Sequence, residues 1–133
     1  MRTTILTWLR AVLMGLLLVL GGCGGHDISS VKSALLGHWV TESGETHYYF
    51  NTASLVMLDD GRRMDQTYAV LELNEAGNWI KIRVKTGYEM GHDKHLVFSP
   101  DRKSLTQKIE LEEFGKNVII STRWNYVDLK KLP

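Results

Sequence analysis

The chain of 133 residues is poor in several features, and each shortage restricts what the protein can be. It contains a single cysteine, Cys23, so no disulfide within the chain can hold a domain together. It has two prolines, and its acidic and basic residues almost balance at a net charge of +1. A near-neutral chain without a basic patch gives no electrostatic case for nucleic-acid binding. Such a domain must be stabilised by its apolar core.

The sequence also lacks an apolar run long enough to span a membrane. The longest one, 11–20, has ten residues, about half of what a spanning helix needs. Arg10 interrupts any extension of it, and a central arginine costs roughly 3 kcal/mol on insertion scales. The run follows Arg2 and Arg10 and leads into Gly21 and Gly22. A basic start, a short apolar middle and small residues at the end are typical of an export signal.

Leu20-Gly21-Gly22-Cys23 resembles the lipobox of bacterial lipoproteins. The resemblance implies cleavage before Cys23, a diacylglycerol on its sulfur and an acylated amino group, so that acyl chains such as palmitate anchor the protein in membrane lipid. The residue after Cys23 is not an aspartate. In cells with two membranes, this absence resembles the pattern of lipoproteins that are sent to the outer membrane, where they face the periplasm. Two alternatives stay open: an uncleaved anchor helix with a free cysteine, and ordinary cleavage without lipidation.

Cleavage before Cys23 would leave 111 residues with 14 basic and 15 acidic side chains, a net charge of −1. A chain of this length forms one small domain. We divide the sequence into a signal peptide over 1–22, a lipidated tether and short helix over 23–36, and a β-barrel domain over 37–133. The helix is predicted over 27–36, capped by Asp27 or Ser29. One face of it carries Ile28, Val31, Leu35 and Leu36.

From Gly37 onward the pattern is typical of strands separated by turns. Residues 79–85 alternate strictly between apolar and charged side chains, and residues 104–111 repeat the alternation, with Gln107 as an inward polar exception. The predicted strands are 38–43, 46–50, 54–58, 63–73, 79–88, 94–99, 104–112 and 117–127. Turns this short join antiparallel neighbours. We therefore predict an all-β fold, an antiparallel up-and-down barrel of about eight strands that closes to remove exposed edges.

Gly37-His38-Trp39, at the start of the first strand, resembles the GxW motif of lipocalins and lipocalin-like domains. The resemblance implies that Trp39 closes one end of an eight-stranded barrel and that an arginine on the last strand, here Arg123, covers its ring. A guanidinium stacked on an indole would form a cation–π contact. The alternation of the last strand, however, puts Trp124 on one face and Arg123 on the other.

An eight-stranded barrel is either filled by its own side chains or holds one small ligand. A hydrophobic ligand, carried or sensed, would suit an apolar pocket in an anchored envelope protein. The alternative is that the same inward side chains form a packed core. The candidate lining residues are Tyr48, Phe50, Ile80, Ile82, Val84, Leu105 and Ile109.

The sequence offers no catalytic constellation. Acylation would occupy Cys23, and the serines stand outside any GxSxG motif. His92-Asp93-Lys94-His95 is the nearest approach to a metal site, but on a strand its two histidines point to opposite faces. We predict a non-enzymatic protein without metal or cofactor.

A protein-binding module is the alternative to a ligand carrier. Small lipoprotein barrels act in bacterial envelopes as assembly accessories or as inhibitors. Tyr48, Tyr49, Tyr88 and Met90 lie near predicted strand ends, where aromatic side chains can form a contact patch with an envelope protein. The alternative reading of these residues is ordinary packing at the rim of the barrel.

Overall fold

The computed structural model describes residues 25–88, 90–113 and 115–132, and for 110–113 the backbone alone. The signal peptide over 1–22 and Cys23 lie outside the described residues and stay predictions. One helix, α2 (Val31–Leu35), precedes the strands. In chain order the strands are β1 Gly37–Thr41, β2 Thr46–Phe50, β3 Ser54–Asp59, β4 Arg62–Asn74, β5 Trp79–Lys85, β6 His92–Phe98, β7 Ser104–Glu113 and β8 Lys116–Asp128.

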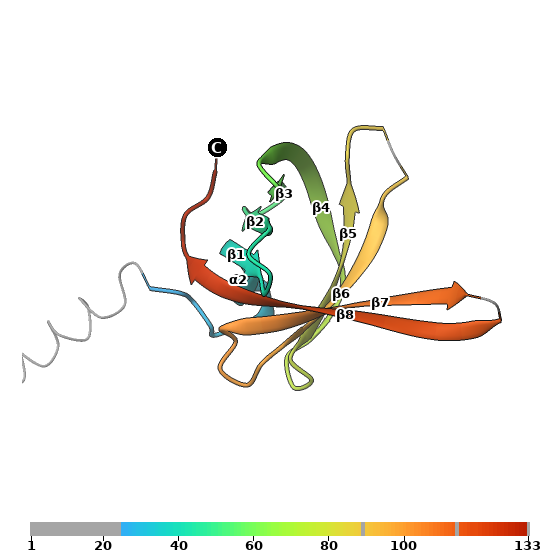
Figure 1. Ribbon diagram of the computed structural model, residues 1–133. Coiled ribbons are helices and arrows are strands. Elements are labelled where there is room, and N and C mark those ends of the chain that lie inside the picture. Colours follow the sequence, from blue (N-terminus) through green and yellow to red (C-terminus); the bar gives the residue numbers. More distant parts are fainter. Residues whose placement is uncertain (1–24, 89, 114, 133) are drawn as a thin grey trace, which may run out of the picture.

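Each strand pairs antiparallel with the next, and β8 pairs with β1, so the sheet closes into a barrel (Figure 1). The predicted all-β, up-and-down barrel of eight strands with a short helix before it is confirmed. Most strand boundaries differ from the prediction by one or two residues. The largest difference is at β5, which ends at Lys85 and not at residue 88, and β6 begins at His92 and not at residue 94. Gly87 and Gly91 between them have positive φ angles, 60° and 83°, which turn the chain out of the extended conformation.

The helix is shorter than predicted, and its cap is Ser30 instead of Asp27 or Ser29. Ser30 Oγ accepts a hydrogen bond from the backbone N–H of Ser33 at 3.1 Å, which satisfies one of the free amides of the first turn. Asp27 forms a turn before the helix by accepting hydrogen bonds from Ser29. Val31 on the inner face is fully buried, so the helix is fixed by packing.

Alternation along the strands sends the large apolar side chains into the barrel, as the sequence predicts. They form a single cluster with the buried face of α2. The fully buried members with the largest side chains are Trp39, Trp124, Phe50, Leu35, Leu55, Ile80, Ile82, Leu96 and Leu105. Two tryptophans and a phenylalanine thus occupy much of the interior.

The two ends of the barrel are built differently. At one end lie α2 and the turns 75–78 and 99–103; we call it the closed end. At the other lie the turns 60–61 and 86–91 and the tip of the β7–β8 hairpin; we call it the open end.

Arg102 ties the closed end together. Its guanidinium donates hydrogen bonds to the Ile28 carbonyl at 2.8 Å, to Asn78 Oδ1 at 2.9 Å and to Glu75 Oε2 at 3.1 Å. The Glu75 carboxylate accepts in turn from the N–H of Val31 at 3.2 Å, at the start of α2. An acidic group at a helix N-terminus is favourable. One network therefore holds the helix to two turns of the barrel.

Trp39 fills the closed end, as the resemblance to lipocalins implies. It is fully buried, and its Nε1 donates a hydrogen bond to the Leu35 carbonyl at 2.8 Å. The ring packs edge-on against Tyr126 at 5.4 Å and against His26 and Phe98 at 5.9 Å each. The helix, the first strand and the last strand therefore meet at one indole.

Candidate functional site

The β7–β8 hairpin extends beyond the strands beside it (Figure 1). The pairing of β7 with β6 ends at Lys108, opposite His95, and that of β8 with β1 ends at Trp124, opposite Thr41. In the segments 109–113 and 116–122 the two strands pair with each other alone among the strands that the structure describes. We call these two segments the projecting hairpin.

Apolar side chains are exposed on the projecting hairpin. The exposed fractions are 37% for Ile109, 38% for Val118, 60% for Ile119 and 46% for Ile120. Ile109 and Ile120 lie directly opposite each other on the face continuous with the barrel interior, whereas Ile119 points to the other face. Exposed apolar side chains that cluster in this way mark sites of interaction.

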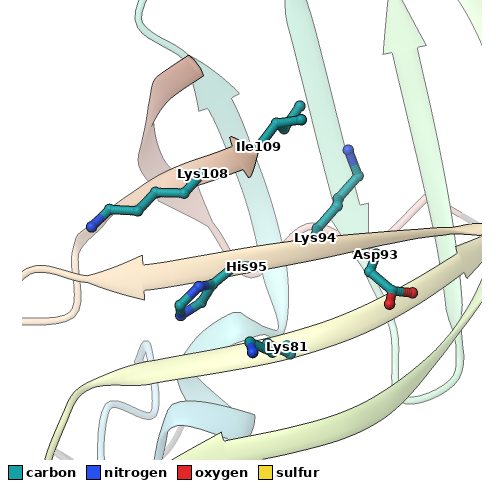
Figure 2. A pocket seen from close by; sticks show the side chains of 6 residues that line it. All are labelled: Lys81, Asp93, Lys94, His95, Lys108 and Ile109. Atoms are coloured by element: carbon teal, nitrogen blue, oxygen red, sulfur yellow. The ribbon is translucent and has the colours of Figure 1, made fainter. Parts of the chain in front are cut away.

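A pocket of about 280 Å³ lies where β6 and β7 separate. Its lining residues, drawn in Figure 2, are Lys81, Asp93, Lys94, His95, Lys108 and Ile109.

The pocket is positively charged. Its carboxylate among the described residues, Asp93, already accepts from the Arg83 guanidinium at 2.8 and 3.1 Å, which holds the pKa of Asp93 below its ordinary value. Lys81, His95 and Lys108 follow one another across three strands on the outer surface.

Lys94 lies on the inner face of β6, on the side opposite to His95 (Figure 2). Its residue is 7% exposed, and its Nζ lies 5.6 Å from the ring centre of Tyr48 and 5.9 Å from that of Trp124. Those two rings stack at 4.0 Å. Burial lowers the pKa of Lys94 from 10.5 to about 8. No role is predicted for this lysine from the sequence, although its alternation with Leu96 and Phe98 indicates that it points inward.

Six of the seven predicted lining residues belong to the packed core. Each of the six is no more than 7% exposed, and they contact one another in a single cluster. The six are Tyr48, Phe50, Ile80, Ile82, Val84 and Leu105. The seventh, Ile109, is 37% exposed and lines the pocket at the open end instead, because β7 outruns β6.

The predicted contact between Arg123 and Trp39 is wrong. Arg123 is exposed on the outer face of β8, and its guanidinium donates to Ser104 Oγ at 3.4 Å. The reason is the alternation of the strand, because the neighbouring Trp124 is fully buried and points inward. Aromatic rings, not a guanidinium, surround Trp39.

The other sequence candidates are scattered. Tyr88 and Met90 are fully exposed in the loop between β5 and β6, whereas Tyr48 is in the core. His92 shares the inward register of Val84, and His95 points outward, so the two imidazoles do not converge. In the part of the chain that the structure describes, no group of three or more metal-binding side chains forms.

Comparison with protein-family models gave no match, and comparisons with curated proteins and with solved structures gave none either. Within the described residues, no helix has the length and apolar character needed to cross a membrane.

Proposed function

We propose that this protein is a lipid-anchored, non-enzymatic lipoprotein of the bacterial envelope that binds a partner protein through the projecting hairpin. One observation carries the proposal: four exposed apolar residues stand on strand segments that pair with each other alone among the described strands. Free strand edges are templates for another strand, and natural proteins usually protect them. A partner that adds a strand or packs on the apolar face would supply that protection.

The place of the anchor supports this assignment. Cys23 is three residues before His26, whose ring stacks on Tyr126 at 3.6 Å and lies 2.7 Å from the Ala34 carbonyl oxygen. The packed contacts of the described chain therefore reach back to His26. Three residues span at most about 10 Å. The closed end would face the membrane, which in a cell with two membranes is the outer one, and the hairpin would point away from it into the periplasm.

A small hydrophobic ligand is the second candidate function. The pocket beside Lys94 supports it, since Ile109 lines that pocket at the start of the apolar face of the hairpin. The packed interior below supports a ligand held at the rim more than one enclosed by the barrel.

Replacing Cys23 with serine tests the anchor. The Cys23→Ser protein is expected in the soluble fraction with an intact barrel, because two or more acyl chains hold a protein stably and none would remain. Fractionation of cells and circular dichroism of the released protein measure this. Continued association of the folded variant with membranes would contradict the lipid anchor.

A photo-crosslinking side chain tests the partner. Placed at Val118 in the lipidated protein, it should give one discrete protein adduct in cells. Glu72, exposed on the wall of the barrel in β4, is the matched control position. An Ile120→Asp substitution should abolish the adduct from position 118, because residues 118 and 120 lie on the same face of β8 and a charge on this apolar face opposes docking. Equal adducts from both positions, or none from position 118, would refute the proposal.

A further inference from the structure

The edge of β8 in the projecting hairpin is a row of backbone groups that pair with no other described strand. The Arg123 carbonyl oxygen accepts a hydrogen bond from the Glu42 N–H at 2.9 Å, so the backbone groups of Arg123 point toward β1. Backbone groups of successive residues point to alternate edges of a strand, and the register of β8 against β7 has no shift over 116–125. Beyond the end of β1, every second residue of β8 therefore points its N–H and C=O to the free side of the hairpin (Figure 1). These residues are Asn117, Ile119 and Ser121.

The edge of β7, on the other side of the hairpin, is less suited to receive a strand. Three of the five residues in the segment 109–113 are glutamates. Charged residues are one means by which natural proteins protect a strand edge. The segment 116–122 of β8 contains no acidic residue, and at its centre are Val118, Ile119 and Ile120, all exposed. An incoming strand would therefore pair with β8.

The residues along this edge indicate the chemistry of the incoming strand. Its centre is apolar, and its two ends carry the exposed basic residues Lys116 and Arg123. Side chains opposite each other on neighbouring strands stabilise the pair when both are apolar or when their charges are opposite. The matching strand therefore has an apolar centre and acidic ends. A second copy of this chain matches less well, because its segment 116–123 would add two more basic residues and no acidic one.

We propose that the partner adds an extended segment to the β8 edge over 116–122, hydrogen-bonded to the backbone of Asn117, Ile119 and Ser121, and that this segment carries apolar residues between acidic ends. A strand of seven residues spans about 23 Å. In such strand addition the main-chain hydrogen bonds supply affinity and the side chains supply specificity. The inference rests on the proposed function, since it states how the partner of the projecting hairpin binds.

Proline at position 119 tests strand addition in cells. Ile119→Pro removes an N–H that points away from β7, and proline is tolerated on an edge strand at such a position. It should reduce the adduct from the photo-crosslinker at Val118 at least tenfold, whereas Ile119→Ala, which keeps the N–H, should reduce it less than threefold. Equal adducts from the two variants would overturn strand addition and leave the protein partner in place, whereas no adduct from the parent would refute the proposed function itself.

Circular dichroism of the Cys23→Ser protein establishes that Ile119→Pro folds. If it does not fold, Ser121→Pro and Ser121→Ala are compared in the same way, because the Ser121 N–H also points to the free side. The expected ratio of adducts between the proline and alanine variants is the same, and equal adducts would again overturn strand addition.

A peptide tests the chemistry of the incoming strand without the cellular partner. The full chain carrying Cys23→Ser is mixed at pH 7 with the capped peptide Glu-Thr-Val-Ile-Val-Thr-Glu, and amide hydrogen exchange is followed by NMR. In the free protein the amides of 117, 119 and 121 should exchange at least tenfold faster than those of 118, 120 and 122. Saturating peptide should slow exchange at the first three amides at least fivefold. The same peptide with lysine at both ends should bind at least fivefold more weakly.

Each part of the inference has an outcome that would overturn it. Unchanged exchange at amides 117, 119 and 121 with millimolar peptide would overturn strand addition, and shifts of the Val118 and Ile120 methyl resonances alone would assign binding to the apolar face. Equal affinity for the two peptides would overturn the acidic ends. Dimerisation of the free chain in analytical ultracentrifugation, abolished by Ile119→Pro, would give the edge to a second copy.

Discussion

Two fully buried tryptophans of this barrel have contrasting surroundings. Trp39 at the closed end donates its indole hydrogen to the Leu35 carbonyl, next to a helix that Arg102 and Glu75 hold in place. Trp124, toward the open end, has no described acceptor and lies beneath a buried lysine. A satisfied polar network rigidifies a fold, whereas an unsatisfied one is expected at functional sites. We therefore infer that the closed end stabilises the barrel, and the open end is our candidate for the binding region.

The largest difference between the ends should appear on truncating apolar side chains. Trp39→Ala should lower the free energy of unfolding by about 4 kcal/mol, because it empties a packed site that α2 covers. Ile119→Ala on the projecting hairpin should change it by less than about 0.5 kcal/mol. Urea denaturation followed by circular dichroism measures both. Similar losses in the two variants would contradict the division of roles.

Charged groups should separate the two ends next. Arg102→Met should cost about 3 kcal/mol, since it leaves the Ile28 carbonyl, Asn78 and Glu75 without their donor at the closed end. The exposed Arg83–Asp93 pair near the open end is the control, and Arg83→Met should cost less than about 1 kcal/mol. The same urea titrations apply. A smaller cost for Arg102→Met than for Arg83→Met would contradict the clamp.

Raising the pH should stabilise the open end. The pKa of Lys94 is about 8 in the fold and 10.5 when unfolded, so the folded state favours the neutral amine. The contribution of neutral Lys94 to the free energy of unfolding is fully present above pH 10.5 and is lost as the pH falls toward 8. Between pH 8 and 10 the free energy of unfolding should rise by about 2 kcal/mol.

The matched variant and an upper limit define this test. Lys94→Met should remove the rise, measured by urea denaturation at each pH, and a rise of the same size in that variant would exclude Lys94 as its cause. Above pH 10 the buried phenols of Tyr48 and Tyr68 act in the opposite direction, because burial raises the pKa of each to about 12. The comparison therefore ends at pH 10.

Acid should weaken the closed end slightly. On its outer face, burial lowers the pKa of His38, and the charge of Asp128, 3.6 Å from Nδ1, opposes that effect only partly. Neutral His38 lies with Nε2 2.8 Å from His47 Nδ1. Its contribution is complete above pH 6.5 and is lost as the pH falls through the lower folded pKa. His38→Gln should flatten this decline below pH 6.5, the smallest of these effects; an unchanged decline would assign it to other groups.

The sequence was sufficient for the parts of the fold that follow from local alternation and turn chemistry. Inward residues such as Ile80 and Ile82, the strand order and the burial of Trp39 were predicted correctly for that reason. The open end was not predictable in the same way. That Ile109 is exposed and Lys94 buried depends on where β7 outruns β6, which is a property of pairing between distant residues. The outward position of Arg123 could have been predicted from the inward position of its neighbour Trp124. The analogy with lipocalins led us instead to place Arg123 against Trp39.

The stacking of His26 on Tyr126 has a consequence for the height of the molecule above the bilayer. With Cys23 as the anchor, about 10 Å of chain separates the lipid from the closed end. The thirteen residues of β8 span roughly 40 Å from there to the hairpin tip. So short a tether would limit tilting of the barrel toward the bilayer. The apolar tip of the hairpin would be held at most about 50 Å above the headgroups. The hairpin would therefore meet molecules that cross the compartment, not those embedded beside its own anchor.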